Sequence, residues 1–398
     1  MELTKLINNP LLLLKSNVTI DNLDARERKL HQLYIISLLL ILIVALITRI
    51  YVTFISGLSW FSSDSYDYLN MAEAIFAGHP YAKFPNGIPI LIAMVRFFFN
   101  PKVLSQALVS LNIILSTLVV LLTINITKQI SGSRLIGILA GAIIAFYPNQ
   151  INYVRQILSE VPTSFFLTLS IFVFLKKKYF FSGLILFIAT MCRTDLLFVL
   201  PLLFICSLFY FGRMGKARKA VYYLVGYGLG IVLYSMLLHL NVVSSTNRYG
   251  LEILKSIVAD SLQENYPGIS SFSSEEIQHP IQTYVKYAVE HPIEYTKQRL
   301  AALENMWGWA PSPSRSLHNK IFIAIRFPIF ILAMLAFYKQ RKKFDVWVVL
   351  IPIFALTILH VITYSSPRYT FTVEPLLISL ACIFFSRKIY LQSEASKV

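Results

Sequence analysis

Residues 33–55 read LYIISLLLILIVALITRIYVTFI, an almost uninterrupted apolar run in which Arg49 is the only charged residue. An α-helix needs about 20 such residues to cross the hydrocarbon core of a bilayer, so this segment predicts a membrane span. The whole chain has the same character, because 56% of its 398 residues are hydrophobic and 14% are charged, with a mean hydropathy of +0.63. Soluble domains carry about 25% charged residues. We therefore predict an all-α, multi-pass integral membrane protein.

Similar apolar runs recur along the chain and predict about ten transmembrane helices. The region from 179 to 210 is the least clear, because it is too long for one crossing and short for two. Basic clusters at Lys176–Lys178 and at Arg213–Lys219 flank it. Clusters on the same side of the membrane require two crossings, with a turn at residues 193–195 near the outer side. The predicted spans are 33–55, 104–125, 135–148, 158–175, 179–192, 195–211, 220–239, 320–338, 346–364 and 373–386.

The formal net charge of +16 reflects membrane topology and not nucleic-acid binding, because Lys and Arg occur mostly in short clusters between the apolar runs. With both termini in the cytoplasm, the inner side carries 21 Lys/Arg and 6 Asp/Glu, and the outer side carries 15 Lys/Arg and 14 Asp/Glu. This asymmetry follows the positive-inside rule. We predict a plasma-membrane protein with both termini inside and no nucleic-acid partner.

Two long segments then lie outside the membrane and divide the chain into four parts. The second of them has a helical pattern between Ile281 and Met306, which predicts a small helical cap. Trp307 and Trp309 at its end are expected to anchor at the membrane interface, with stacking on a sugar as the alternative. The predicted parts are a cytoplasmic tail or interfacial helix (1–32), a transmembrane core (33–239) with the first outer loop (56–103), the extracytoplasmic cap (240–319), and C-terminal helices with a short cytoplasmic tail (320–398).

Within the first outer loop, residues 60–89 read WFSSDSYDYLNMAEAIFAGHPYAKFPNGIP. Apolar positions from Tyr66 onward have helical spacing, so the segment predicts a helix along the outer interface, with Asp64 at or near its N-cap. The residue types alone leave open whether Asp64 only caps this helix or takes part in chemistry.

The order of residues in this loop resembles the first outer loop of GT-C glycosyltransferases, in particular the branch with the protein O-mannosyltransferases and the bacterial aminoarabinose transferases. The likeness covers residues 49–210 and, locally, 365–385. The matching residues are Asp64, Tyr68, Ala72 and Gly78, then Pro85-x-Gly87-x-Pro89, with Arg49 before them and Phe146-Tyr-Pro148, Tyr153 to Arg155, Leu158-Ser-Glu160, Arg193, Pro367-Arg368-Tyr369 and Pro375 after them.

This resemblance implies an enzyme that transfers a sugar from a polyprenyl-phosphate carrier to an acceptor hydroxyl at the extracytoplasmic face. In the family, the acidic residue of the first loop is the catalytic base, which corresponds here to Asp64, with Asp67 as the second candidate. A hydroxyl is a poor nucleophile until a carboxylate accepts its proton. A single displacement at the anomeric carbon would invert its configuration.

The leaving polyprenyl phosphate gains charge as the glycosidic bond breaks, so cationic groups at headgroup level would stabilise the transition state. The alternative role of such cations is ordinary contact with lipid headgroups. The candidates for donor binding are Arg368, Arg193, Arg155, Arg49 and Lys83, together with Tyr369 and Tyr68.

Glu160 and Asp195 are acidic residues at membrane depth, where ionised groups are costly and are usually paired or functional. Asp195 is predicted to neutralise Arg193. Glu160 has several open roles: it pairs with Arg155 or caps its helix, or, as the resemblance implies, it lines the active cavity. There it would orient the acceptor or hold a divalent cation with Asp64. No cofactor is required by the sequence, and the metal question stays open.

Two other functions are compatible with many spans and a charged outer surface. A lipid-linked-sugar flippase or transporter would place its charges near mid-membrane, whereas the charges here gather at the outer ends of the spans. An outer-face polysaccharide polymerase or ligase would move a whole lipid-linked glycan with similar elements. The sugar stays open, as does the acceptor, which is a protein, a lipid or a glycan.

Overall fold

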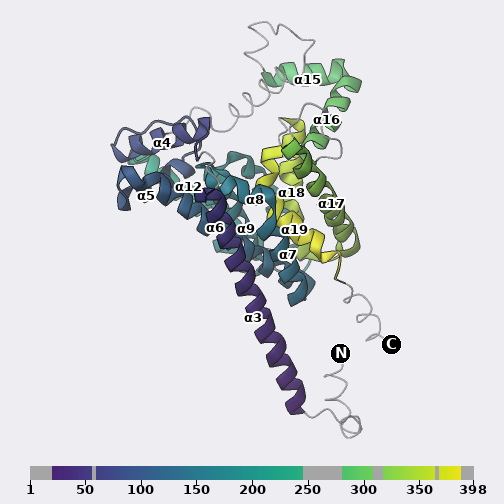
Figure 1. The fold of residues 1–398 in the computed structure, drawn as a ribbon. Helices are drawn as coiled ribbons and strands as arrows, with labels where there is room; N and C mark the ends of the chain where they lie inside the picture. Colours follow the sequence, from purple (N-terminus) through teal and green to yellow (C-terminus); the bar gives the residue numbers. More distant parts are fainter. Residues whose placement is uncertain (1–19, 56–59, 245–279, 308–316, 364–366, 387–398) are drawn as a thin grey trace.

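The computed structural model describes residues 20–55, 60–244, 280–307, 317–363 and 367–386, and every regular element in these ranges is a helix (Figure 1). The all-α prediction is confirmed. The elements are α3 (Ile20–Ile50), η1 (Tyr51–Ile55), α4 (Ser63–Phe76), α5 (Gly87–Phe98), α6 (Pro101–Ser131), α7 (Arg134–Phe146), α8 (Pro148–Asn152), η2 (Tyr153–Arg155), α9 (Glu160–Leu175), α10 (Tyr179–Cys192), η3 (Thr194–Phe198), α11 (Val199–Gly212), α12 (Arg218–His239), α15 (Pro280–Glu290), α16 (Pro292–Trp307), α17 (Leu317–Gln340), α18 (Phe344–Ile362), η4 (Pro367–Val373) and α19 (Glu374–Ile383).

Five helices in the described ranges are long and apolar enough to cross a bilayer. A sixth is added if α7 and the segment 148–155, which bend by 55° at their break, form one broken span. Each of the ten predicted spans falls mainly on a helix, but the number ten is not confirmed. One reason is length: α9, α10 and α19 contain 16, 14 and 10 residues, fewer than the roughly 20 that a straight crossing needs.

Helix boundaries follow local sequence signals. Asn100 caps α6, since its side chain accepts from the Lys102 backbone N–H at 3.1 Å, and Pro101 occupies the first turn. The helix ends at Gly132, whose φ of 71° is the left-handed conformation that favours glycine. Ser133 then caps α7. The connection between these two long helices is therefore encoded locally.

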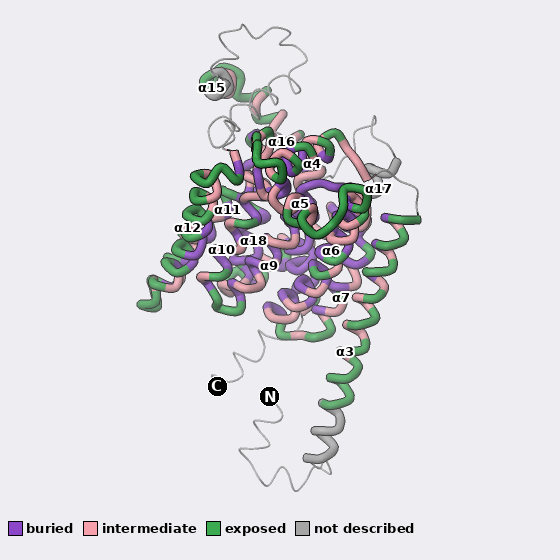
Figure 2. Tube along the Cα trace, turned by 90° about the vertical axis from the view of Figure 1, so that its left-hand side faces the viewer, coloured by how far each residue is buried: buried purple, intermediate pink, exposed green. Residues whose placement is uncertain are grey.

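The buried core lies among α6, α9, α10, α18 and α19, and all of α19 is buried. Figure 2 shows α3 at the edge with a largely exposed surface, as expected for a helix whose apolar side chains face lipid. α10 and α12 pack closely because both carry glycine at the contact. A Cβ atom at Gly183 would collide with the Tyr223 carbonyl, and one at Gly226 with the Phe180 carbonyl.

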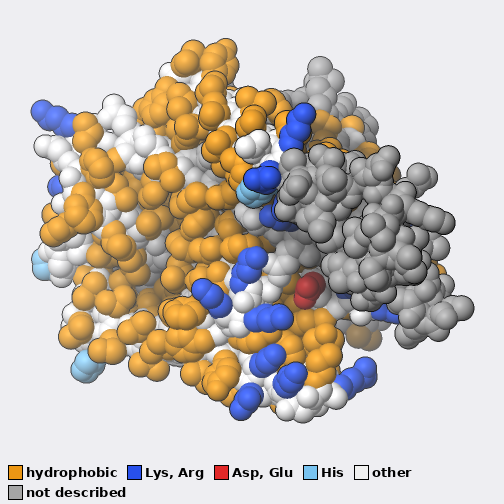
Figure 3. Space-filling model, turned by 90° about the horizontal axis from the view of Figure 1, so that it is seen from below, with side chains coloured by type: hydrophobic (Ala, Val, Ile, Leu, Met, Phe, Trp, Pro, Cys, Tyr) orange, Lys and Arg blue, Asp and Glu red, His pale blue; other side chains and the backbone are white. Residues whose placement is uncertain are grey.

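The two ends of the helix bundle differ in charge. α4, α5, α15 and α16 lie at one end (Figure 1). At the opposite end, Lys and Arg side chains gather and acidic side chains are scarce (Figure 3). The connections α6–α7, α9–α10, α11–α12 and α17–α18 supply basic residues there, namely Lys128, Arg134, Lys176, Lys177, Lys178, Arg213, Lys216, Arg218, Lys219, Arg341, Lys342 and Lys343.

The helical pattern expected between Ile281 and Met306 appears as α15 and α16, which are separated at His291. The interfacial role expected for Trp307 is wrong. This side chain is fully buried, stacks on Phe330 with ring centroids 4.8 Å apart, and donates from Nε1 to Thr357 at 3.2 Å. Residues 245–279 and 308–316 of the predicted cap, and residues 1–19 of the predicted tail, lie outside the described ranges.

Candidate active site

Asp64 lies in the first turn of α4, which begins at Ser63. Ser62 is the cap residue, and its backbone N–H donates to the Ser65 hydroxyl at 3.0 Å. Because Ser62 occupies the cap position, the Asp64 carboxylate is free to extend from the helix N-terminus, where the helix dipole favours negative charge. Its side chain is 30% exposed. The interpretation that Asp64 only caps this helix therefore does not hold.

Glu160 begins α9 and is fully buried. Its Oε1 atom accepts from Arg368 Nε and lies 3.5 Å from Arg193 Nη1, while Oε2 has no hydrogen-bond partner among the described residues. A buried carboxylate is tolerated only where cations pair with it. Two arginines from distant parts of the chain hold Glu160, and the expected partner Arg155 is not among these contacts.

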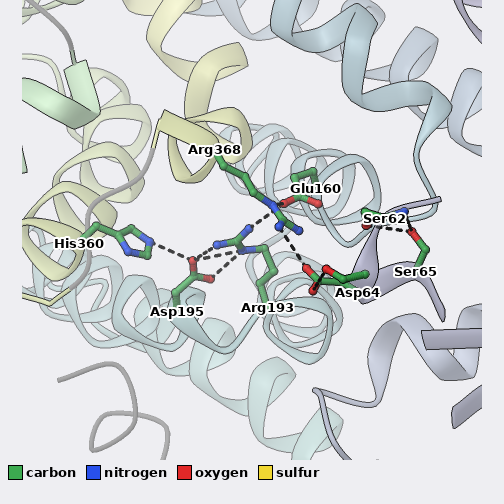
Figure 4. A network of polar contacts seen from close by, with 9 residues as sticks. Ser62, Asp64, Ser65, Glu160, Arg193, Asp195, His360 and Arg368 are labelled. Atoms are coloured by element: carbon green, nitrogen blue, oxygen red, sulfur yellow. Dashed lines mark hydrogen bonds and ion pairs between the residues drawn. The ribbon is translucent and has the colours of Figure 1, made fainter. Parts of the chain in front are cut away.

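Arg368 joins the first loop to the helix bundle. It lies in η4, and its guanidinium donates from Nη1 to Asp64 Oδ2 at 3.1 Å and from Nε to Glu160 (Figure 4). Burial alone would lower the pKa of Arg368, but the Glu160 and Asp64 carboxylates outweigh this effect and raise the pKa above its ordinary value. The side chain is 33% exposed, so a fixed positive charge stands at the edge of the buried network.

Arg193 extends the network from Glu160 to Asp195 (Figure 4). It follows α10 in an extended conformation and donates from Nη2 to Asp195 Oδ2 at 2.8 Å, so the predicted pairing is confirmed. The Asp195 carboxylate also lies 3.1 Å from His360 Nε2. Tyr369 packs against both partners of Asp195. Its ring stacks on the His360 ring with centroids 4.2 Å apart, and its centroid lies 5.0 Å from the Arg193 guanidinium.

The Pro85-x-Gly87-x-Pro89 motif docks the first loop against the turn that carries Arg193. A Cβ atom at Gly87 would stand 2.5 Å from the Met191 carbonyl, so only glycine allows this approach of α5 to the end of α10. Asn86 beside it is fully buried and donates to the Tyr234 hydroxyl at 2.8 Å. The motif therefore has a structural role: it brings α4, which carries Asp64, against the helix bundle.

Tyr68 lies in α4 and is 5% exposed. Burial and, to a smaller extent, the nearby Glu160 carboxylate raise its pKa to about 12, against the opposing effect of a hydrogen bond with Ser159. Its hydroxyl is therefore protonated at neutral pH. The ring packs on Phe84 with centroids 5.1 Å apart, which connects α4 to the segment before α5.

Four predicted residues are placed away from this cluster or in other contacts. Asp67 pairs with Lys83 at 2.7 Å on the surface of the first loop, so each neutralises the other. Arg49 is fully buried and donates from Nε to Ser116 at 2.7 Å, which leaves it without access to a donor phosphate. Arg155 ends η2 and is half-buried.

Sequence reasoning missed three polar residues that the fold buries. His360 near the end of α18 supports Asp195, and Arg326 in α17 pairs with Glu374 at the start of α19 at 3.3 Å. All three are less than a tenth exposed. Each lies in or beside an apolar run, and the cost of ionisable groups at membrane depth is the signal that would have identified them.

The cluster combines two chemical capacities. Asp64 and Arg368 are each about one-third exposed, whereas Glu160 is fully buried and Arg193 and Asp195 are each 11% exposed. A partly exposed carboxylate can accept a proton, and a partly exposed guanidinium can bind a phosphate through paired N–H donors. Among the described residues, no group of three or more His, Cys, Asp or Glu is placed to hold a metal ion.

The arrangement of helices is similar to that of the oligosaccharyltransferase from Archaeoglobus fulgidus. The apo structure aligns with a TM-score of 0.54 and 13% identity over 86% of this chain and 50% of that one. The form tethered to an acceptor peptide with the NVT sequon has a TM-score of 0.57, at 13% identity over 87% and 49% of the two chains. The protein has a GT-C glycosyltransferase fold.

A complex of the oligosaccharyltransferase AglB from Archaeoglobus fulgidus with an inhibitory peptide and a dolichol-phosphate aligns with this chain at a TM-score of 0.53, with 13% identity over 86% and 50% of the two chains. Residues 98–207 match the family model of dolichyl-phosphate-mannose-protein mannosyltransferase. The fold and this partial family match agree with the resemblance drawn from the motifs. The chain spans about half the length of these solved structures. No curated protein matches the sequence.

Proposed function

We propose that this GT-C protein transfers a sugar from a polyprenyl-phosphate carrier to an acceptor hydroxyl at the extracytoplasmic face of the membrane, with inversion at the anomeric carbon. The observation that carries the proposal is the contact between the partly exposed Asp64 carboxylate and the Arg368 guanidinium, backed by buried Glu160. Asp64 is the general base, and Arg368 binds the carrier phosphate.

In the proposed step, the acceptor hydroxyl oxygen attacks the anomeric carbon and its proton passes to an Asp64 carboxylate oxygen. The bond from the anomeric carbon to the phosphate oxygen breaks, and its electron pair leaves with the polyprenyl phosphate. Arg368 stabilises this growing charge, since a fixed guanidinium matches phosphate oxygens well. Arg193 lies behind it, and its charge is balanced by Asp195 and Glu160.

A lipid-linked donor is supported by two observations on similar proteins. The matching family model describes enzymes that use dolichyl-phosphate mannose, and the archaeal structure with similar fold was solved with a dolichol-phosphate. The same archaeal enzyme was solved with an acceptor peptide, which supports a protein acceptor. Lipid and glycan acceptors carry hydroxyl groups of the same chemistry and are included in the test below.

The charge distribution supports an extracytoplasmic site. Asp64 belongs to α4, at the end of the bundle opposite the basic connections (Figures 1 and 3). The positive-inside rule assigns a basic end to the cytoplasm, and the N-terminal part of α3 lies toward that end (Figure 1). We therefore place loop 56–103 and segment 240–319 outside, and both termini inside, in a multi-pass protein of the plasma membrane.

The test is a transfer assay with the purified protein in proteoliposomes. Polyprenyl-phosphate carriers with different radiolabelled sugars are supplied together with membrane extract as the acceptor source. We expect loss of carrier-linked sugar, release of polyprenyl phosphate and a product with inverted anomeric configuration. Two results would contradict the proposal. Consumption of only diphosphate-linked glycans indicates a polymerase or ligase, and transbilayer movement of a fluorescent lipid-linked sugar without its consumption indicates a flippase.

A further inference from the structure

A second buried polar cluster surrounds Glu374, which follows η4 and begins α19. Glu374 is fully buried. Its Oε1 atom accepts from Asn149 Nδ2 at 2.7 Å, from Thr370 Oγ1 at 3.3 Å and from Arg326 Nη2 at 3.3 Å, and Oε2 accepts from Gln150 Nε2 at 3.1 Å. Donors from α8, α17 and η4 therefore converge on one carboxylate.

These contacts hold the backbone that carries Arg368. Gln150 Nε2 donates to the Phe371 carbonyl at 3.0 Å as well as to Glu374, and Thr370 is in the same short helix. η4 is a 3-10 helix of 7 residues, and runs beyond 3–4 residues are uncommon because their hydrogen-bond geometry is poor. Such a turn needs support from outside, and the cluster supplies it directly after Arg368.

The support extends to Arg49 in the first span. Arg49 donates from Nη1 to the Ala145 carbonyl at 3.2 Å, near the end of α7, where helical carbonyls lose their own partners. Its Nε donates to Ser116, whose hydroxyl lies 3.5 Å from the Gln150 carbonyl. Arg49 thus holds the break between α7 and α8, from which the Gln150 side chain reaches η4.

Charge balance alone does not account for this arrangement. Arg326 is 1% exposed and would neutralise Glu374 without help. The amides of Asn149 and Gln150 and the hydroxyl of Thr370 add no charge, but they define the direction of the carboxylate and of the following turn. A buried carboxylate that accepts four hydrogen bonds from three elements favours one local conformation.

We propose that Glu374 is a positioning residue for Arg368, with Gln150 as its main partner. The pair holds η4 in the conformation that directs the Arg368 guanidinium toward Asp64 and Glu160. This inference rests on the proposed function, in which Arg368 binds the carrier phosphate. A shift of about 1 Å in such a group is enough to reduce turnover by about 100-fold.

The test compares turnover of Glu374→Gln and Gln150→Ala with a control at the other end of α19. Gln340 donates to the Ile383 carbonyl at 3.3 Å and forms no hydrogen bond with η4 among the described residues. Gln340→Ala therefore loosens the same helix away from the site. We expect kcat to fall about 10- to 100-fold in the two test variants and to stay within about twofold in the control. Gln150→Ala changes no charge and decides the outcome if Glu374→Gln does not fold.

A double-mutant cycle with Arg368→Lys separates positioning from general stability. If Glu374 and Gln150 act through Arg368, their substitution has little further effect once Arg368 is replaced, because neighbouring residues in one network are not additive. Additive losses, or normal turnover of Gln150→Ala, would overturn the inference. Absence of sugar transfer by the wild-type protein would instead contradict the proposed function, so the two failures are distinguishable.

Discussion

The Arg368 guanidinium donates to the Asp64 carboxylate at 3.1 Å, although 304 residues separate the two in the sequence. The carboxylate that we propose as base is thus paired with the cation that we propose for the donor phosphate. In this account a carrier phosphate that takes up Arg368 leaves Asp64 open to an acceptor hydroxyl. Substitution of either residue therefore tests its proposed role directly.

Arg368→Lys keeps the charge but removes the planar group that reaches Asp64 and Glu160 at once. A lysine ammonium is a point charge without paired donors. We expect kcat/KM for the carrier-linked sugar to fall about 100-fold, the range seen when one transition-state donor is lost. Steady-state kinetics in proteoliposomes measure this, with Lys83→Arg on the loop surface as the control. An Arg368→Lys enzyme with wild-type kcat/KM would exclude the assigned role.

Chelation of divalent cations is expected to leave turnover unchanged. A cation held by Asp64 and Glu160 would need the position that the Arg368 side chain occupies between them, and the guanidinium already supplies positive charge there. Turnover measured with EDTA and then with added Mg²⁺ or Mn²⁺ tests this expectation. A large loss with EDTA that Mg²⁺ or Mn²⁺ restores would show that a cation, and not Arg368 alone, serves the two carboxylates.

His360→Phe keeps an aromatic ring to stack on Tyr369 but removes the hydrogen bond to Asp195. Hydrogen bonds to charged groups contribute about 1.5–3 kcal/mol, so we expect about a tenfold loss of turnover as Arg193 becomes less well ordered. His360→Gln retains an N–H donor and should recover most of the activity. Equal activity of the Phe variant and the wild type would show that the contact has no part in the site.

Gly87→Ala places a Cβ atom 2.5 Å from the Met191 carbonyl. Overpacking of this kind costs about 1–3 kcal/mol, and here it would move α5 and α4 away from the bundle. We expect a lower thermal unfolding temperature together with lower turnover. Gly228→Ala is the control, because no atom lies within 4 Å of its added Cβ and alanine favours the helix. A fully active, stable Gly87→Ala protein would contradict the docking role of the motif.

The sequence allows prediction of those parts of the site that depend on local spacing or on motif order. Asp195 was expected to pair with Arg193 because the two lie two positions apart, and the structure confirms the contact. The order of motifs named Asp64, Glu160 and Arg368 as separate candidates. Their mutual contacts were not predictable, because Glu160 and Arg368 are 208 residues apart and only the packing of α9 against η4 brings them together.

Other predictions failed because the fold decides burial. In the sequence, Arg49 is placed as an arginine at a membrane boundary would be. In the structure it donates to the Ala145 carbonyl inside the protein, at the break between α7 and α8. Trp307 is suited to an interface, but its ring stacks on Phe330 of α17 and its N–H donates to Thr357 of α18. Apolar run length indicates helices without telling a full span from a short one, so α9 and α10 were included in the count of ten spans.

The most direct measurement compares Asp64→Asn with Asp67→Asn in the transfer assay, using the same carrier and acceptor. Loss of a general base costs about 100- to 10,000-fold, so Asp64→Asn should lose nearly all transfer and still bind the donor. Asp67 is occupied by Lys83 on the loop surface, and its Asn variant should retain transfer within about threefold of the wild type. Transfer that survives Asp64→Asn at the wild-type rate, or that disappears with Asp67→Asn instead, would contradict the account.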